Sequence, residues 1–325
     1  MKAMARKGKN KRYTQKKRYR RRIGIGTIGL VGGISLCYLA VPTQAYKKDK
    51  TCEAGTIKLP ISTILVNGQY LIDQNVVDRD EILVYKDEPK VYVGTNEEGL
   101  QYGYDANIIA DKLAHYDYSN NGEKIVFLTF DDGTSTTVTP KILEILKAYD
   151  VKATFFLLGS NIEKGGEQAQ ALVKQIFDEG NAIANHSYTH EYRILYPNRT
   201  LNLENFKADF EKNEDYIKEI LGVDFTTRVL RCPGGYMSWD NMNQLDSYLL
   251  ENDKVSIDWN ALTKDAEGAK KDKDQLVQEA KNTSEGKEIV VLLMHDTYGK
   301  EATAEALPEI IEYYKANGYT FKTLI

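Results

Sequence analysis

The sequence predicts an α/β fold in which about seven parallel strands curl into a (β/α) barrel. After Gly122, short β-rich apolar runs alternate with segments of helical length and spacing, the pattern of parallel strands joined by crossover helices. The seven such runs favour a barrel over an open sheet. Residues able to do chemistry follow several of these runs, and functional residues of such barrels collect at the C-terminal ends of the strands.

The individual elements can be placed from local patterns. Strands are predicted at residues 125–129, 153–158, 182–185, 228–231, 255–259, 289–294 and 319–324. Helices are predicted at residues 140–148, 167–178, 203–221, 241–252, 274–284 and 302–316. Apolar residues make up 42% of the chain and charged residues 28%, a composition able to bury a large core.

The N-terminal region has a separate character. Residues 1–22 hold twelve Lys or Arg and no acidic residue, and the rest of the chain carries 31 basic and 47 acidic groups, a net charge of −16. This acidic body argues against nucleic acid as a partner. Residues 23–41 carry no charge and would span about 28 Å as a helix, which predicts a single-pass signal anchor with residues 1–22 in the cytoplasm and the rest outside the cell membrane. The alternative is a signal peptide cleaved within residues 43–45.

Between this anchor and Gly122 the sequence predicts two further segments. Residues 42–56 are polar and are expected to be a stalk, and residues 57–121 a small β-containing unit with a turn at Asn67-Gly68 and a helix near residues 105–115. This unit could be a spacer, a glycan-binding module or a dock for another protein, and no protein partner is predicted. Residues 122–325 form the large domain. The two cysteines outside the apolar run, Cys52 and Cys232, are expected to be unpaired thiols.

Several histidines and aspartates of the large domain are the ligand types that a catalytic metal site uses. His186 and His190 are four residues apart, so a tight turn can direct both imidazoles to one ion, and Asp131 or Asp132 can supply a third ligand. Taken alone, the two histidines could equally be surface residues. Adjacent aspartates at the end of an extended strand point in different directions, so one could bind metal while the other acts on water. The alternative for the aspartates is an Asp-Asp-Gly turn with solvated carboxylates.

Two more segments carry candidate groups. Arg231 begins a loop of residues 231–235 that could hold its guanidinium against a carboxylate and present a backbone N–H to an oxyanion. A structural turn with a surface arginine is the alternative, and Cys232 is expected to be a packed side chain. His295 ends an apolar strand, where it is either a neutral core histidine or a general acid with a pKa near neutrality.

These residues together resemble the polysaccharide deacetylases of carbohydrate esterase family four, which share the NodB-homology domain. The resemblance covers about residues 122–325 and includes five motifs in order, at residues 129–133, 186–190, 231–235, 259–265 and 293–295. It implies a distorted (β/α) barrel with fewer than eight strands. The sequence departs from the family at Cys232 and Gly234, where the family often has proline and an aromatic residue.

The resemblance also implies roles for individual residues. Asp131 would be the catalytic base oriented by Arg231, and His295 the acid supported by Asp265. Asp258 is the alternative support, less favoured because it lies inside a predicted strand. The metal, Zn²⁺ with Co²⁺, Mn²⁺ or Ni²⁺ as alternatives, would be held by Asp132, His186 and His190. The expected substrate contacts are the oxyanion donor Gly234, the methyl-pocket residue Leu293, and Gly235, Tyr236 and Trp259.

The predicted function follows from these roles and from the predicted location. An anchored hydrolase outside the membrane meets cell-wall polysaccharide first, so we expect removal of N-acetyl groups from peptidoglycan N-acetylglucosamine. The alternatives are an O-acetyl esterase or a chitooligosaccharide deacetylase acting on another glycan, and a catalytically silent wall-binding module.

Overall fold

The computed structural model describes residues 64–66, 69–71 and 91–325. The predicted cytoplasmic tip, signal anchor and stalk lie outside these residues. Contacts divide the chain into two units, Met1–Val84 and Tyr85–Ile325. In the first unit, β1 (Ile64–Val66) pairs antiparallel with β2 (Gln69–Leu71), on either side of the predicted turn at Asn67-Gly68. Within the described part of the chain, no helix has the length and apolar character needed to cross a membrane.

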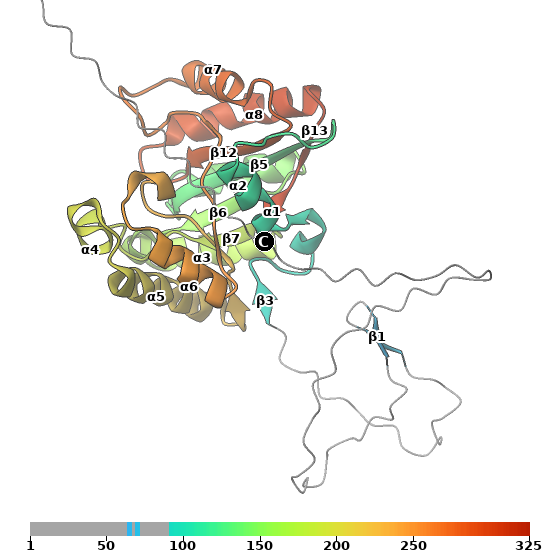
Figure 1. The fold of residues 1–325 in the computed structure, drawn as a ribbon. Coiled ribbons are helices and arrows are strands. Elements are labelled where there is room, and N and C mark those ends of the chain that lie inside the picture. The colour runs from blue at the N-terminus through green and yellow to red at the C-terminus, as the bar shows by residue number, and fades with distance from the viewer. Residues whose placement is uncertain (1–63, 67–68, 72–90) are drawn as a thin grey trace, which may run out of the picture. The chain divides into compact units, whose positions relative to one another are not determined.

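The second unit is built on a curled sheet of parallel strands (Figure 1). Seven strands follow the order β10-β9-β7-β6-β5-β12-β11, and β13 also pairs with β5. The strands are β5 (Lys124–Gly133), β6 (Thr154–Leu157), β7 (Ala182–Asn185), β9 (Val229–Leu230), β10 (Val255–Ser256), β11 (Ala261–Leu262), β12 (Ile289–His295) and β13 (Tyr319–Phe321). The sheet forms a half-barrel, so the predicted barrel of about seven parallel strands is confirmed.

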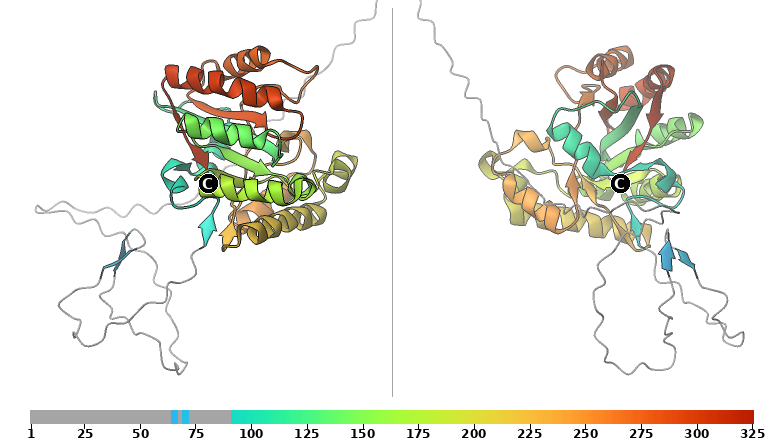
Figure 2. Two further views of the ribbon diagram at one scale, coloured as in Figure 1. Left: turned by 180° about the vertical axis from the view of Figure 1, so that it is seen from behind. Right: turned by 45° about the vertical axis from the view of Figure 1, so that its right-hand side comes forward.

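Helices cover the outer face of this sheet (Figure 2). The left view of Figure 2 shows α8, α2, α3 and α5 side by side across that face, and each contacts the next. The α-helices of the whole second unit, on either face, are α1 (Ala106–Ala114), α2 (Thr139–Ala148), α3 (Gly159–Asp178), α4 (Tyr192–Leu195), α5 (Leu203–Leu221), α6 (Asn243–Glu251), α7 (Lys273–Ser284) and α8 (Glu301–Ala316). Three short 3₁₀ helices are η1 (Gly99–Tyr102), η2 (Pro197–Arg199) and η3 (Tyr236–Ser238).

The pleat of the strands explains how the sheet positions polar groups. In β5, Val126 and Leu128 pack with the outer helices, whereas Ile125 and Phe127 pack on the concave side with residues of α1. Because side chains alternate along a strand, Asp131 continues the inward row. The inward row of β12 likewise ends in a polar residue, His295, which lies opposite Asp131 in the register. Apolar burial at the base of the sheet therefore leads to ionisable groups at its C-terminal rim.

Most predicted elements occur close to their expected positions. Strand β7 and helix α5 have the predicted bounds. The Asn202 side chain accepts a hydrogen bond from the Asn205 N–H at the start of α5, and Gly222 ends the helix at φ +66°. Helix α3 begins eight residues earlier than predicted and has a kink at Gly166, which hides its first turns from an analysis of apolar spacing. Strand β11 has only two residues and was not predicted.

Residues 91–121, which we grouped with the small β-containing unit, contact the sheet body in the structure. The strand β3 (Tyr92–Val93) pairs with β8 (Phe225–Thr226), and β4 (Gly103–Tyr104) pairs with β14 (Thr323–Leu324). The helix α1 packs Ala106 and Ile109 against the concave side of the sheet. The compact body therefore includes the predicted helix near residues 105–115, and by contacts it begins at Tyr85 rather than at Gly122.

Candidate active site

A bulge at the end of β5 brings two adjacent carboxylates to one point. The register with β6 shifts between Asp131 and Gly133, and Asp132 has φ +66°. Consequently Asp131 Oδ2 lies 3.6 Å and Asp132 Oδ1 3.5 Å from His186 Nε2. Our expectation that the two side chains diverge assumed an extended backbone. The bulge removes that condition, so both carboxylates face the same imidazole.

Asp132, His186 and His190 form a cluster suited to a metal ion. Their ligand atoms lie within 4.8 Å of one another, and Asp132 Oδ1 is buried with no hydrogen-bond partner among the described residues. His186 Nδ1 lies 2.8 Å from the Arg231 carbonyl oxygen, so it must donate, which leaves the Nε2 lone pair directed at the cluster. Burial lowers the pKa of His186 to about 3, so its imidazole is neutral and able to ligate. Two imidazoles and one carboxylate fit Zn²⁺ or a neighbouring first-row ion.

The turn that carries the two histidines is held by residues that the sequence analysis missed. Asp209, a buried residue of α5, accepts hydrogen bonds from the N–H groups of Tyr188 and Thr189 at 2.9 and 3.1 Å. Asn185 accepts the Ser187 N–H at 3.0 Å. The available signal was the position of Asp209 on the apolar face of a predicted helix, where a carboxylate is unusual.

Arg231 is a fully buried cation beside Asp131. Its Nη1 lies 2.6 Å from Asp131 Oδ1 and 3.0 Å from Thr129 Oγ1, and its Nε donates to the Ile257 carbonyl at 2.9 Å. Its guanidinium also stacks 4.0 Å from the Phe156 ring centre. Burial raises the pKa of Asp131, while the charge of Arg231 acts in the opposite direction. The surface-arginine alternative is therefore wrong.

His295 is paired with Asp265. The ring Nδ1 of His295 lies 2.8 Å from Asp265 Oδ1, and the backbone N–H of His295 donates to Asp265 Oδ2 at 2.8 Å. Thr303 Oγ1 donates to the same Oδ2 at 2.9 Å. Burial disfavours the charged imidazole, but the hydrogen bond and charge of Asp265, together with Asp131, raise the pKa of His295 to about 9. We had expected a pKa near neutrality. The sequence does not reveal how much negative charge surrounds this ring.

Asp258, the alternative partner for His295, lies elsewhere. Its Oδ1 and Oδ2 accept the Tyr236 N–H at 2.9 and 3.1 Å. The Asp258 carboxylate thus holds the loop that follows Arg231. Asp265 alone of the two contacts His295 in the structure.

The predicted substrate contacts occupy different environments. Gly234 is exposed, and its N–H makes no hydrogen bond within the described part of the chain. Gly235 is buried, and a Cβ at this position would lie only 2.9 Å from Cη2 of Trp259. The Tyr236 hydroxyl donates to Asp246 on α6 at 2.7 Å. Leu293 is buried on the inward row, two residues before His295. The roles of these residues stay predictions.

Tyr192 borders the cluster and Trp239 packs against Tyr192, and neither residue was identified as a site residue from the sequence. The Tyr192 ring centre lies 5.1 Å from that of His190 and 5.0 Å from that of Trp239. Burial raises the pKa of the Tyr192 hydroxyl, and the charge of Asp132 adds to the effect, so the group stays protonated at neutral pH. No spacing in the sequence connects Trp239 with the histidines.

Two buried groups near the site complete the description. Cys232 is a free, buried thiol, as expected of a packed side chain. Asp296 is buried behind Gly133, and Thr139 Oγ1 donates to its Oδ2 at 2.6 Å. A Cβ at Gly133 would lie 2.3 Å from that Oδ2 atom, so only glycine fits there. Burial raises the pKa of Asp296 to about 7, with the charge of Asp132 contributing.

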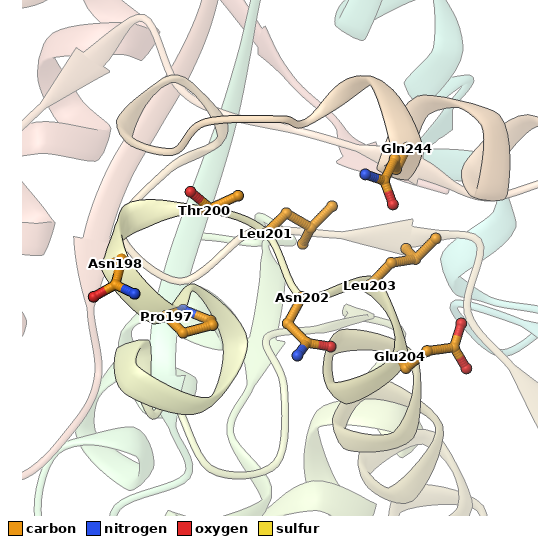
Figure 3. Close-up of a pocket in the computed structure, with 8 residues that line it drawn as sticks. All are labelled: Pro197, Asn198, Thr200, Leu201, Asn202, Leu203, Glu204 and Gln244. Carbon is orange, nitrogen blue, oxygen red and sulfur yellow. The ribbon is translucent and has the colours of Figure 1, made fainter.

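A separate open groove of about 540 Å³ lies between the α4–α5 connection and the start of α6 (Figure 3). It is lined by Pro197, Asn198, Thr200, Leu201, Asn202, Leu203, Glu204 and Gln244. None of the predicted site residues lines it. The chemistry described above is therefore located by its ligand atoms and ion pairs, and the groove is a distinct surface feature.

Comparison with known proteins assigns this constellation to a family. The family model described as polysaccharide deacetylase matches residues 118–250. A peptidoglycan-N-acetylglucosamine deacetylase of Bacillus cereus is 31% identical over 270 residues, which cover 76% of this chain and 90% of that protein. The chain belongs to the polysaccharide deacetylase family.

Other polysaccharide deacetylase relatives differ in length and name. A bifunctional xylanase/deacetylase of Pseudobutyrivibrio xylanivorans is 32% identical over 208 residues, which cover 63% of this chain but 31% of that protein. The solved structure of a Streptococcus mutans CE4 esterase superposes on this chain with a TM-score of 0.66. The two sequences are 34% identical, and the match covers 73% of this chain and 98% of the esterase chain. The family that the motifs predicted is therefore confirmed.

Proposed function

We propose that this deacetylase removes N-acetyl groups from cell-wall glycan, with peptidoglycan N-acetylglucosamine as substrate. One observation carries the proposal: three groups of residues from distant parts of the chain meet at one rim of the sheet. These are the ligand cluster of Asp132 and its two histidines, the Asp131–Arg231 pair and the His295–Asp265 pair. A ligand cluster flanked by a buried carboxylate and a charged imidazole has the parts required for hydrolysis of an acyl bond.

The chain's own groups divide the reaction between them. Asp132, His186 and His190 would hold a divalent cation, which when bound would supply Lewis-acid polarisation. Asp131 accepts a proton from the attacking water, because Arg231 orients its carboxylate and favours the charged form against the effect of burial. The Gly234 N–H donates to the oxygen of the acetyl carbonyl as negative charge develops there. His295, charged at neutral pH because of Asp265, gives a proton to the departing sugar amine. The products are acetate and a free amino sugar.

The choice of glycan rests on two supports outside the site. The relative from Bacillus cereus is named a peptidoglycan-N-acetylglucosamine deacetylase. The sequence also predicts a single-pass anchor at residues 23–41, which would hold the deacetylase domain outside the membrane and next to the wall. We therefore propose that the protein is anchored at the cell membrane. We also propose zinc as the metal, because two imidazoles and a carboxylate suit this ion.

Acetate release tests the proposal directly. The purified protein is incubated with peptidoglycan after removal of metal and again after addition of zinc, cobalt, manganese or nickel. We expect acetate only in the metal-loaded samples, and much less from the Asp131→Asn variant. Absence of acetate release with every metal would exclude this substrate.

An O-acetyl ester is the second candidate for the bond that is cleaved. The Streptococcus mutans relative is named a CE4 esterase, and the Pseudobutyrivibrio relative is named a bifunctional xylanase/deacetylase. Rates on matched N-acetyl and O-acetyl sugars distinguish the two candidates. A rate on the ester alone would replace the amide proposal.

The predicted anchor requires a separate measurement. We expect the native protein to sediment with membranes and to retain residues 1–22, as shown by mass spectrometry of its N-terminal peptides. A mature N-terminus near Tyr46 would instead indicate a cleaved signal peptide.

A further inference from the structure

The hydroxyl group of Tyr192 lies at the edge of the proposed active site. Tyr192 is the first residue of α4 and follows the metal-ligand candidate His190 by two positions. Their ring centres are 5.1 Å apart. Tyr192 is 43% exposed, and its hydroxyl makes no hydrogen bond within the described part of the chain. It is a free donor beside the cluster.

Gly234 brings the proposed oxyanion donor next to this hydroxyl. A Cβ at Gly234 would lie 3.3 Å from the Tyr192 hydroxyl oxygen and 3.0 Å from Cζ2 of Trp239. The space that a side chain at position 234 would occupy is therefore filled by these two aromatic residues. The absence of that side chain lets the phenol approach the loop, so the Tyr192 hydroxyl lies beside the backbone of Gly234, the residue whose N–H is the proposed oxyanion donor.

Trp239 fixes the position of Tyr192. The Trp239 Nε1 donates to the Pro233 carbonyl at 2.8 Å, and its ring stacks on Tyr196 with centres 4.2 Å apart and planes 6° apart. The Tyr192 ring contacts Trp239 at 5.0 Å. A donor held in place by packed rings loses little freedom when a substrate arrives, which is the condition for effective stabilisation of developing charge.

We propose that the Tyr192 hydroxyl is a second donor to the oxyanion, next to the Gly234 N–H. This inference rests on the proposed function and adds a catalytic residue to it. As the water oxygen bonds to the acetyl carbon, the carbonyl π electrons move to the oxygen, and the phenol donates a hydrogen bond without losing its proton. When the C–N bond breaks, that electron pair re-forms the carbonyl, and the nitrogen takes its proton from His295.

The Tyr192→Phe variant tests the proposal because it removes one oxygen and keeps the ring contacts. Loss of one oxyanion donor costs about 10²–10³-fold in kcat at a buried site, and we expect about 10- to 100-fold for this half-exposed hydroxyl. KM should stay within about twofold, because the hydrogen bond strengthens only as charge develops. Zinc affinity, measured by calorimetry on the metal-free protein, should also be unchanged. Tyr149→Phe is the matched control, since its hydroxyl bonds to Glu312 at 2.7 Å, away from the site.

Three results would overturn the inference while the wild-type protein releases acetate. The first is a Tyr192→Phe kcat equal to that of wild type. The second is a raised KM with unchanged kcat, which would mean that the hydroxyl binds the ground state. The third is a loss of zinc affinity, which would mean that Tyr192 acts through His190. Failure of the proposed function is a different result, namely a wild-type protein that hydrolyses neither amide nor ester.

Discussion

The Asp265→Asn variant gives the sharpest test of the proposed acid. The substitution preserves the size of the side chain and removes the negative charge that contacts His295 Nδ1 at 2.8 Å. Without that charge, the burial of the ring disfavours the imidazolium, and we expect the pKa of His295 to fall from about 9 to its ordinary value of 6.5 or below.

The magnitude follows from the fraction of protonated His295. At about pH 8, a group with a pKa of about 9 is roughly 90% protonated, and one with a pKa of 6.5 is roughly 3% protonated. If His295 must be charged to protonate the leaving amine, kcat/KM at that pH falls by about 30-fold. The sign is fixed: activity is lost as pH rises through the pKa of His295, so lowering this pKa moves the alkaline limb to lower pH.

The assay is acetate release over a range of pH with the metal concentration held constant. Asp258→Asn is the control, because the Asp258 carboxylate contacts the Tyr236 N–H and not His295. The control can lose activity, but its alkaline limb should stay where the wild-type limb lies. An unmoved alkaline limb in Asp265→Asn would refute the assignment of His295 as the acid that Asp265 supports.

Three further substitutions test other parts of the site. Asp131→Asn should lower kcat by about 10²–10⁴-fold with unchanged folding, and a kcat equal to that of the wild type would exclude Asp131 as the base. His186→Ala should weaken zinc binding by more than about 100-fold in calorimetric titration, because even loss of a ligand's supporting group costs 10–100-fold; an unchanged affinity would exclude His186 as a ligand. Arg231→Met should lower the free energy of unfolding by about 3–5 kcal/mol in urea titrations, because it leaves the buried Asp131 carboxylate unpaired. A loss under about 1 kcal/mol would contradict that account of the ion pair.

The positions of the main elements could be predicted because they depend on local patterns. The range of α5 was predicted from local pattern, and in the structure Asn202 caps its start and Gly222 ends it. The kink at Gly166 concealed the start of α3, and a two-residue strand such as β11 carries too little pattern to be detected. The contacts of residues 91–121 with the sheet body are long-range pairings, for which no local signal exists.

The candidate site also has features that the sequence predicted and features that only the structure showed. The sequence supplied the residue types and their placement after strands, so Asp131, Asp132, His186 and His190 were all identified. It did not show the bulge that turns both carboxylates toward His186, because a bulge depends on the register with a neighbouring strand. Tyr192 and Trp239 escaped notice for a related reason, since their contacts join residues that share no periodic spacing.

Residue chemistry and strand order alone thus determined which groups this protein can bring to the rim of its sheet. Tertiary structure decided which of them meet: Asp265 rather than Asp258 beside His295, and Asp209 beneath the histidine turn. It also decided the charge state of His295, whose pKa of about 9 depends on burial and on carboxylates from distant segments. The physical reason is that secondary structure is encoded in neighbouring residues, whereas electrostatic energies and hydrogen bonds depend on distances in space that only the folded chain defines.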